Sequence, residues 1–275
     1  MSDVLIGSAY LVSSAVILIF YIPCMKVFVD DMKNCYQPCY EIMYHLGIAD
    51  IISCLCQAWA GLLSVTGWAY IIPFWLNKTI GAAIDLTWYV STASLQLLAF
   101  NRWAAIRGIA ILNQLLLNKL GTKVCLAIIW MYSLSWAVVL LSPWCSFIYF
   151  GQTWSFYFDT TAKWFEIVKR LNWWHNQLML WPAGLWYLLS VVKIRNQRCN
   201  ITAGSTADRR VQKREQALTK QAAMIFLWTM LGSQWWHGAA YLYNDVGFKY
   251  AYAVGNWLWL ANAAINPLVY LTVNK

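Results

Sequence analysis

Long apolar runs recur along the chain, and short polar stretches separate them. A helix of about 20 mainly apolar residues is needed to cross the core of a bilayer, and seven runs reach that length. We therefore predict an all-α membrane protein, a seven-transmembrane helix bundle in which residues 1–275 form one domain. The predicted spans cover residues 5–27, 41–65, 80–103, 123–143, 172–192, 221–243 and 250–272.

Composition supports a membrane protein. Hydrophobic residues make up 61% of the chain and charged residues 11%, whereas soluble domains carry about 25% charged residues. The 19 Trp and 16 Tyr are typical of side chains that collect at the two membrane–water boundaries. The first run has no basic start and no small-residue cleavage site, so we expect a retained helix and not a signal peptide.

The distribution of positive charge predicts the orientation of the bundle. Of the 20 Lys and Arg residues, 15 follow spans one, three and five or lie at the C-terminus, and many belong to the segment 193–220. Positive residues favour the cytosolic side, so we predict the N-terminus outside and residues 193–220 in the cytosol. The net charge of +9 is then a topology signal. We expect the lipid bilayer as a partner and no nucleic acid.

Two acidic residues fall inside predicted spans. Asp50 lies in the sequence LGIAD of span two, and Asp85 lies in AAIDLTWY of span three. An ionisable side chain costs about 2.5–3.5 kcal/mol at the centre of a membrane helix on insertion scales, and it marks a functional site by default. We expect both carboxyl groups to face the interior of the bundle.

Three short motifs occur in a fixed order on this frame: LGIAD in span two, AFNRW at the end of span three, and NPLVY at the end of span seven. Pro267 in the last motif cannot donate a hydrogen bond to the carbonyl of Ala263, so neighbouring groups have to satisfy that carbonyl. Arg102 alone could be a snorkelling anchor. Together, the motifs resemble those of rhodopsin-type G-protein-coupled receptors.

A narrower resemblance comes from IFYIPCMKVF, CYEIMYHLGIADIIS, LLAFNRW and the final YLTVNK. These segments resemble the nematode serpentine chemoreceptors, class T especially, with class X as the near competitor. The resemblance implies a chemosensory receptor in the cell membrane, in the cilium of a sensory neuron, that activates a heterotrimeric G protein. The segments 104–122 and 193–220 would contact the G protein. The resemblance assigns activation and G-protein coupling to Asp50, Asn101, Arg102, Asn266, Pro267 and Tyr270.

The chain also departs from the rhodopsin-type pattern. Asn101 stands where an acid would pair with Arg102, and Asp50 has few candidate ligands for sodium beyond Asn262 and Asn266. Span three has no cysteine at its outer end, and Cys145 is the single cysteine expected outside, so we predict no structural disulfide. A glycosylation sequon begins at Asn77 on the predicted outside.

We expect a small ligand between the outer halves of the helices, where bundles form pockets. Asp85 could pair with a cation or bond a neighbour such as His237. Aromatic residues could instead form lipid belts, and the histidines fit satisfied bundle residues better than metal ligands, so we expect no metal and no cofactor. The candidate ligand-binding residues are Asp85, Trp88, Tyr89, His175, Gln177, Trp235, Trp236, His237 and Trp257.

Other functions have different sequence requirements. A retinal-based light sensor needs a lysine in the middle of span seven, and none is present. A ligand-gated channel of inverted topology and an amine or peptide receptor of the same fold stay open as alternatives. The sequence has no nucleophile–base pair, metal cluster or phosphate-binding loop, and we do not expect an enzyme.

Overall fold

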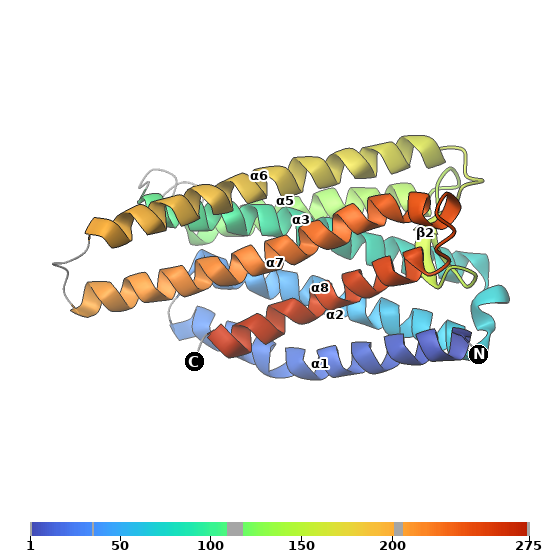
Figure 1. Cartoon of the computed structure of the whole chain (residues 1–275), viewed down its shortest axis with the longest axis horizontal. Helices are drawn as coiled ribbons and strands as arrows, with labels where there is room; N and C mark the ends of the chain where they lie inside the picture. Colours follow the sequence, from blue (N-terminus) through green and yellow to red (C-terminus); the bar gives the residue numbers. More distant parts are fainter. Residues whose placement is uncertain (1, 35, 109–117, 201–205, 274–275) are drawn as a thin grey trace.

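The computed structural model describes the backbone of residues 2–34, 36–108, 118–200 and 206–273; side chains at 196–200, 206–215, 217, 218, 221 and 269–273 lie outside the description. Seven α-helices form an antiparallel bundle in this part of the chain (Figure 1). Each predicted span corresponds to one helix, so the predicted bundle is confirmed. The helices are α1 (Ser2–Asn34), α2 (Pro38–Thr66), α3 (Phe74–Arg107), α5 (Lys119–Leu141), α6 (Phe165–Asn200), α7 (Thr206–Asn244) and α8 (Ala251–Val273).

A β-hairpin joins α5 to α6, and the sequence analysis did not predict it. Its strands are β1 (Phe147–Phe150) and β2 (Ser155–Phe158), paired antiparallel with Phe147 opposite Phe158. Each strand has only four residues, too short for a clear alternating pattern. A short 3₁₀ helix, η1 (Trp68–Tyr70), follows α2. We call the end of the bundle that holds the hairpin and the N-terminus the hairpin end, and the opposite end the Arg102 end (Figure 1).

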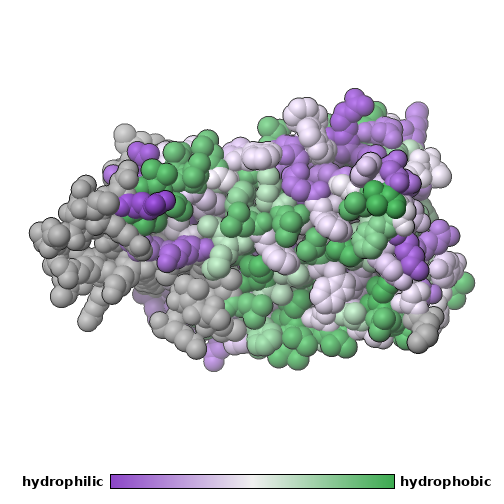
Figure 2. Space-filling view, in the orientation of Figure 1, coloured by the Kyte–Doolittle hydropathy of each residue, from purple (hydrophilic) through white to green (hydrophobic). Residues whose placement is uncertain are grey.

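The helices differ in how apolar they are. By length and composition α1, α2, α5 and the part of α6 from Phe165 to Arg195 could each cross a membrane. Helix α3 is more polar but sits at the centre of the bundle, where its Asp85, Asn101 and Arg102 are buried. On the face shown in Figure 2, hydrophobic side chains cover the middle of the bundle and hydrophilic ones gather toward its ends. This arrangement fits a bilayer around the middle.

Helices α1 and α2 make a backbone contact through two glycines. A Cβ added to Gly7 would lie 2.7 Å from the carbonyl oxygen of Gly61, and a Cβ on Gly61 would lie 2.7 Å from that of Gly7. Small residues allow this close approach in membrane helices, where dispersion and interhelical hydrogen bonds drive association. We call this contact the glycine crossing.

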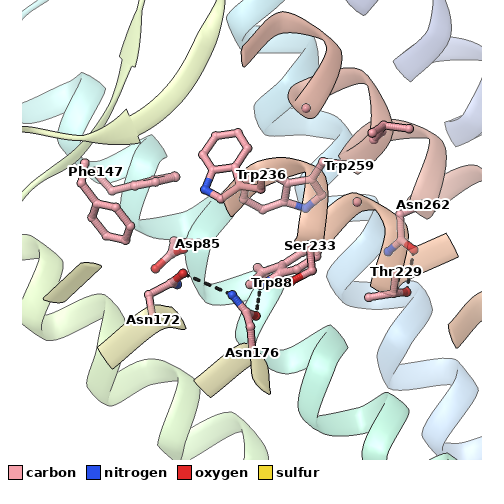
Figure 3. Close-up of a pocket in the computed structure, with 14 residues that line it drawn as sticks. Asp85, Trp88, Phe147, Asn172, Asn176, Thr229, Ser233, Trp236, Trp259 and Asn262 are labelled. Carbon is pink, nitrogen blue, oxygen red and sulfur yellow. Dashed lines mark hydrogen bonds between the residues drawn. The ribbon is translucent and has the colours of Figure 1, made fainter. Parts of the chain in front are cut away.

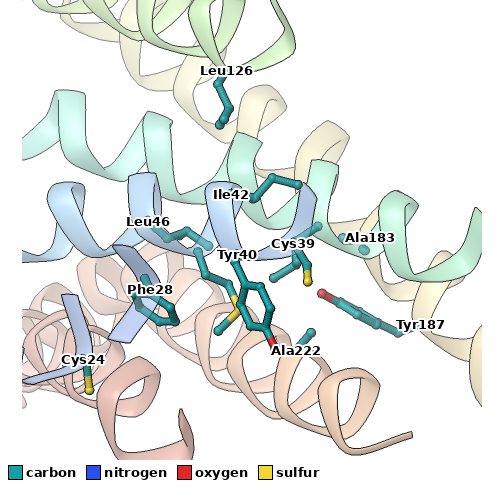
Figure 4. Close-up of a cluster of buried hydrophobic side chains, with 13 residues drawn as sticks. Cys24, Phe28, Cys39, Tyr40, Ile42, Leu46, Leu126, Ala183, Tyr187 and Ala222 are labelled. Carbon is teal, nitrogen blue, oxygen red and sulfur yellow. The ribbon is translucent and has the colours of Figure 1, made fainter. Parts of the chain in front are cut away.

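Buried apolar side chains fill both ends of the bundle. Near the Arg102 end, Phe28, Tyr40, Ile42 and Tyr187 belong to one cluster that joins α1, α2 and α6 (Figure 4). Near the hairpin end, a second cluster joins the hairpin to α2, α3 and α5. The hairpin is therefore part of the packed core.

Candidate functional site

A cavity opens inside the hairpin half of the bundle, and we call it the Asp85 cavity (Figure 3). The space open to the centre of a water-sized sphere is about 30 Å³, room for a few water molecules at most, so a small-molecule ligand requires the side chains of the lining to move apart. Residues of α3, α6, α7, α8 and the hairpin line it: Asp85, Trp88, Phe147, Phe158, Asn172, Asn176, Thr229, Gly232, Ser233, Trp236, Gly255, Leu258, Trp259 and Asn262.

Among the residues that line the cavity, Asp85 is the one with an ionisable side chain. The residue is 3% exposed, and its Oδ2 has no hydrogen-bond partner within the described residues. The hydroxyl of Ser233, across the cavity on α7, also lacks a partner there. Buried polar atoms are normally hydrogen-bonded, so these two atoms offer bonding capacity to a molecule in the cavity.

Tryptophan rings form much of the wall. The rings of Trp88 and Trp259 meet edge to face with centroids 5.3 Å apart, and Trp236 and Trp259 do so at 6.0 Å. Aromatic pairs prefer this geometry. Phe147 from the hairpin packs toward Trp236 with centroids 6.5 Å apart. The wall therefore suits an apolar or aromatic ligand body, and its faces would also attract a cation.

Two asparagines on α6 hold the other wall. The Nε1 of Trp88 donates to Oδ1 of Asn176 at 2.8 Å, and Nδ2 of Asn176 lies 3.2 Å from Oδ1 of Asn172 (Figure 3). Asn172 donates in turn to the hydroxyl of Tyr89 at 2.9 Å. The sequence analysis missed both asparagines. Their spacing of four residues, which places them on one helix face, is the signal that could have found them.

Three of the predicted ligand-binding residues lie in the lining: Asp85, Trp88 and Trp236. Two more stand directly behind it. Tyr89 accepts the hydrogen bond from Asn172, and Nε2 of His237 lies 3.3 Å from Nδ2 of Asn176. His237 thus contacts the asparagine network, whereas the sequence analysis suggested Asp85 as its neighbour.

The other predicted ligand-binding residues are placed elsewhere. His175 bonds the Thr92 hydroxyl at 2.8 Å and the Tyr132 hydroxyl at 2.9 Å, so both of its ring nitrogens are engaged with α3 and α5. Gln177 accepts a hydrogen bond from Trp181 on the exposed face of α6. Each is one residue from Asn176, and a shift of one residue turns a side chain by about 100° around a helix.

Trp257 and Trp235 also lie outside the cavity lining. Trp257 is 44% exposed and lines an apolar groove between α1, α7 and α8. The Nε1 of Trp235 donates to the carbonyl of Ala251 at 2.9 Å, which ties α7 to the start of α8. The exposed Trp257 fits the alternative expectation for the aromatic residues, a lipid belt, whereas Trp235 joins two helices.

A second polar cluster surrounds Asp50. Its Oδ2 accepts hydrogen bonds from the Tyr21 hydroxyl of α1 and from Nδ2 of Asn266 of α8. Tyr21 also reaches the carbonyl of Ala263 at 3.0 Å, the group that Pro267 leaves without its helical donor. Tyr21 is thus the neighbour that supports the break in α8.

Asn262, the other proposed neighbour of Asp50, is used differently. Its Oδ1 accepts a hydrogen bond from Thr229 of α7 at 2.7 Å. The residue Asn262 also lines the Asp85 cavity. Within the described residues, no group of three or more His, Cys, Asp and Glu is arranged to hold a metal ion. Asn262 at the Asp85 cavity and Asn266 in the Asp50 cluster are thus one helical turn apart on α8.

Arg102 is buried near the opposite end of α3. Its Nε and Nη2 donate to Oδ1 of Asn101 at 3.1 and 2.6 Å, and the residue is 4% exposed. The asparagine thus holds the guanidinium with hydrogen bonds where an acid would form an ion pair. The side chain of Tyr270 and most of those in the segment 193–220 lie outside the described residues.

Comparison with known proteins agrees with this architecture. The family described as serpentine type 7TM GPCR chemoreceptor Srt matches residues 1–275, which confirms the class T resemblance. Among solved structures, squid rhodopsin superposes with a TM-score of 0.81 over 98% of this chain and 76% of its own, at 16% sequence identity. Identity this low shows the fold alone. None of the curated proteins matches the sequence.

Proposed function

Because this chain belongs to the Srt family of serpentine seven-transmembrane chemoreceptors, we propose that it binds a small molecule in the Asp85 cavity and then activates a heterotrimeric G protein. The protein is a receptor-type, multi-pass membrane protein with the fold of rhodopsin. The observation that carries the proposal is the buried Asp85 carboxyl group, whose Oδ2 has no partner among the described residues and faces a cavity lined by aromatic rings.

The residues that line the cavity indicate which groups the proposed ligand carries. A hydrogen-bond donor on the ligand, an amine or a hydroxyl, would reach Asp85, and an acceptor would reach the hydroxyl of Ser233. An apolar body would lie between Trp88, Trp236 and Trp259 once these rings move apart. A buried carboxylate strongly favours a hydrogen-bonded partner, so the donor group of the ligand would contribute specificity. Contact with the aromatic rings would contribute affinity.

The proposed signal passes from the cavity to the Arg102 end through α7 and α8. Thr229 and Asn262 join these helices beside the cavity. One helical turn further along α8, Asn266 contacts Asp50. A ligand shifts the receptor between two states only by its difference in affinity for them, and contacts that bridge α7 and α8 can make that difference.

The test is a cell assay with a promiscuous G protein and a panel of small alcohols, amines and carboxylic acids. A compound that activates the wild type should lose at least about tenfold in potency on Asp85→Ala, since a charged-group hydrogen bond contributes about 1.5–3 kcal/mol. Trp257→Phe, outside the cavity, is the matched control. Equal potency on wild type and Asp85→Ala would contradict the proposed site.

The alternatives give different results in the same cells. If Asp85→Asn removes only the responses to cationic compounds, the amine-receptor alternative is favoured. Tags at the N-terminus and within residues 203–208 test the orientation: the receptor predicts the first on intact cells and the second only after permeabilisation. The reverse pattern with ligand-driven currents would indicate the inverted channel. Tagged protein in the animal would test the proposed place in a sensory cilium.

A further inference from the structure

The hairpin closes the Asp85 cavity at the hairpin end. Phe147 and Phe158, which face each other across the two strands, both line the cavity and are 1% and 3% exposed. A two-stranded hairpin is marginally stable by itself. Its position over the cavity therefore depends on contacts with the helices.

Asn77 of α3 makes such a contact with the backbone of β1. Its Nδ2 donates to the carbonyl of Tyr149 at 3.0 Å, and its Oδ1 accepts from the N–H of Tyr149 at 2.8 Å. The carboxamide therefore pairs with both groups of one residue on β1, as a neighbouring antiparallel strand does. Asn77 is 7% exposed.

Gly81, one turn further along α3, brings the helix backbone against the same strand. A Cβ added to Gly81 would lie 1.7 Å from the carbonyl oxygen of Phe147 and 2.6 Å from its carbonyl carbon. Both atoms belong to the backbone, so no change of rotamer could relieve the clash. The side chain of Lys78, between these residues, donates to the carbonyl of Ser142 at 2.6 Å.

The far end of the hairpin is held from another side. Nε1 of Trp154 donates to Oδ1 of Asp3 at 2.7 Å, and the Tyr10 hydroxyl reaches the carbonyl of Trp154 at 2.9 Å. Helix α1 thus fixes the turn, and α3 fixes the strand that lies over the cavity.

The contact of Asn77 conflicts with the sequon Asn77-Lys78-Thr79. A glycan is attached to the side-chain nitrogen of the asparagine, the atom that donates to Tyr149. Glycans are bulky and belong on exposed surface, whereas this amide is buried between α3 and β1. A glycan at Asn77 and the docked hairpin exclude each other.

We propose that Asn77 is a positioning residue that clamps the hairpin over the Asp85 cavity, and that its sequon consequently carries no glycan. Cys145, just before β1, is a free thiol, and α3 has no cysteine. A disulfide between α3 and Cys145 therefore cannot form, and the two hydrogen bonds of Asn77 join helix and hairpin there. It goes beyond the proposed receptor function, and its test requires no ligand.

Cys145 reports whether the hairpin is docked. It is 1% exposed and packs in one cluster with Phe147 and Phe158. Burial raises the pKa of the Cys145 thiol to about 11, and the thiolate is the reactive form. If the hairpin lifts and the pKa returns to about 8.5, the thiolate fraction at pH 7.4 rises by about two orders of magnitude.

The experiment labels intact cells with a membrane-impermeant maleimide, with an N-terminal tag to select receptors at the surface. Wild type should be protected, and Asn77→Ala should react at least ten times faster. Asn77→Asp keeps the acceptor for the N–H of Tyr149 and should restore part of the protection. Cys145→Ser in the Asn77→Ala background should abolish the label.

Gln57→Ala is the matched control. Gln57 exchanges two hydrogen bonds with Asn256, at 3.0 and 2.7 Å, between α2 and α8. This variant loses the same number of buried amide bonds and should keep Cys145 protected. Equal protection of wild type and both Asn77 variants, or equal labelling of Asn77→Ala and Gln57→Ala, overturns the clamp. If Asn77→Ala does not reach the cell surface, the labelling rate of Asn77→Asp is compared with that of wild type instead.

The glycan is tested separately by peptide-N-glycosidase digestion. Thr79→Ala removes the sequon and keeps Asn77. The Thr79 hydroxyl that is lost donates to the carbonyl of Trp75 at 2.8 Å, on the exposed side of α3. Digestion should leave the mobility of wild type unchanged and equal to that of Thr79→Ala. A shift of the wild type that Thr79→Ala abolishes overturns the inference.

Discussion

Removal of the Tyr21 hydroxyl tests how the bundle supports the break at Pro267. This hydroxyl joins three helices, because it contacts Asp50 of α2 and the Ala263 carbonyl of α8 at 3.0 Å. It carries one proton, for which the two acceptors compete. Tyr21→Phe keeps the ring, which is 1% exposed, and removes only the hydroxyl.

The expected cost follows from the groups that lose their partner. A buried acceptor without its donor costs about 1–3 kcal/mol, whereas interhelical hydrogen bonds in a membrane protein average about 0.6 kcal/mol. We expect the larger range here, because Asp50 and Ala263 are both affected and Pro267 supplies no replacement N–H. A loss of about 1–3 kcal/mol, at about 2–4 °C per kcal/mol, lowers the apparent Tm by roughly 2–12 °C.

The assay is thermal unfolding of a fluorescent fusion in detergent, followed by size exclusion. Tyr187→Phe is the matched control: Tyr187 is 3% exposed, and its hydroxyl has no hydrogen-bond partner among the described residues. Its effect should stay within about 0.5 kcal/mol. Pro267→Ala adds an N–H for the Ala263 carbonyl, so Tyr21→Phe should cost less in that background. A wild-type Tm for Tyr21→Phe, or an equal cost in both backgrounds, would refute the reasoning.

Three further predictions concern single contacts. Thr229→Val removes the 2.7 Å bond to Asn262 and should lower the free energy of unfolding by about 1 kcal/mol; an unchanged melt would contradict it. Gln57→Ala leaves the amide of Asn256, which is 0% exposed, without its two hydrogen bonds to Gln57 and should lower the free energy of unfolding by about 1–3 kcal/mol. Replacing both residues by Leu should lower it less, and the same thermal unfolding assay compares the two variants. Since burial raises the pKa of Cys145 to about 11, the rate at which an alkali-stable thiol reagent labels purified wild type should still rise with pH above about 8.5, the value of a free thiol, and a plateau there would count against the burial.

The sequence was sufficient for the bundle because lipid imposes a simple pattern. Each span needs about 20 apolar residues, and seven such runs are present. The buried positions of Asp50 and Asp85 also follow, since charged side chains in a membrane turn toward the bundle interior. These predictions depend on composition over long windows and on the cost of charge in lipid.

Side-chain direction was harder to predict. His175, Asn176 and Gln177 are consecutive, yet Asn176 alone of the three lines the cavity. One residue changes the direction by about 100°, and a Trp-rich helix with apolar residues on every side gives little indication of its inner face. The hairpin was missed for a related reason, because its four-residue strands have no long-range pattern and their place is set by Asn77 and Gly81, some 70 residues earlier in the chain.

The glycine crossing has a mechanical consequence for the receptor. If α1 or α2 advanced by one residue in a screw motion, about 1.5 Å along its axis and 100° around it, Ser8 or Leu62 would enter a space in which a Cβ on either glycine already lies 2.7 Å from a carbonyl oxygen. The pair therefore resists sliding and rotation and behaves as a rigid frame. In the proposed receptor, a ligand would therefore move the other helices against this frame.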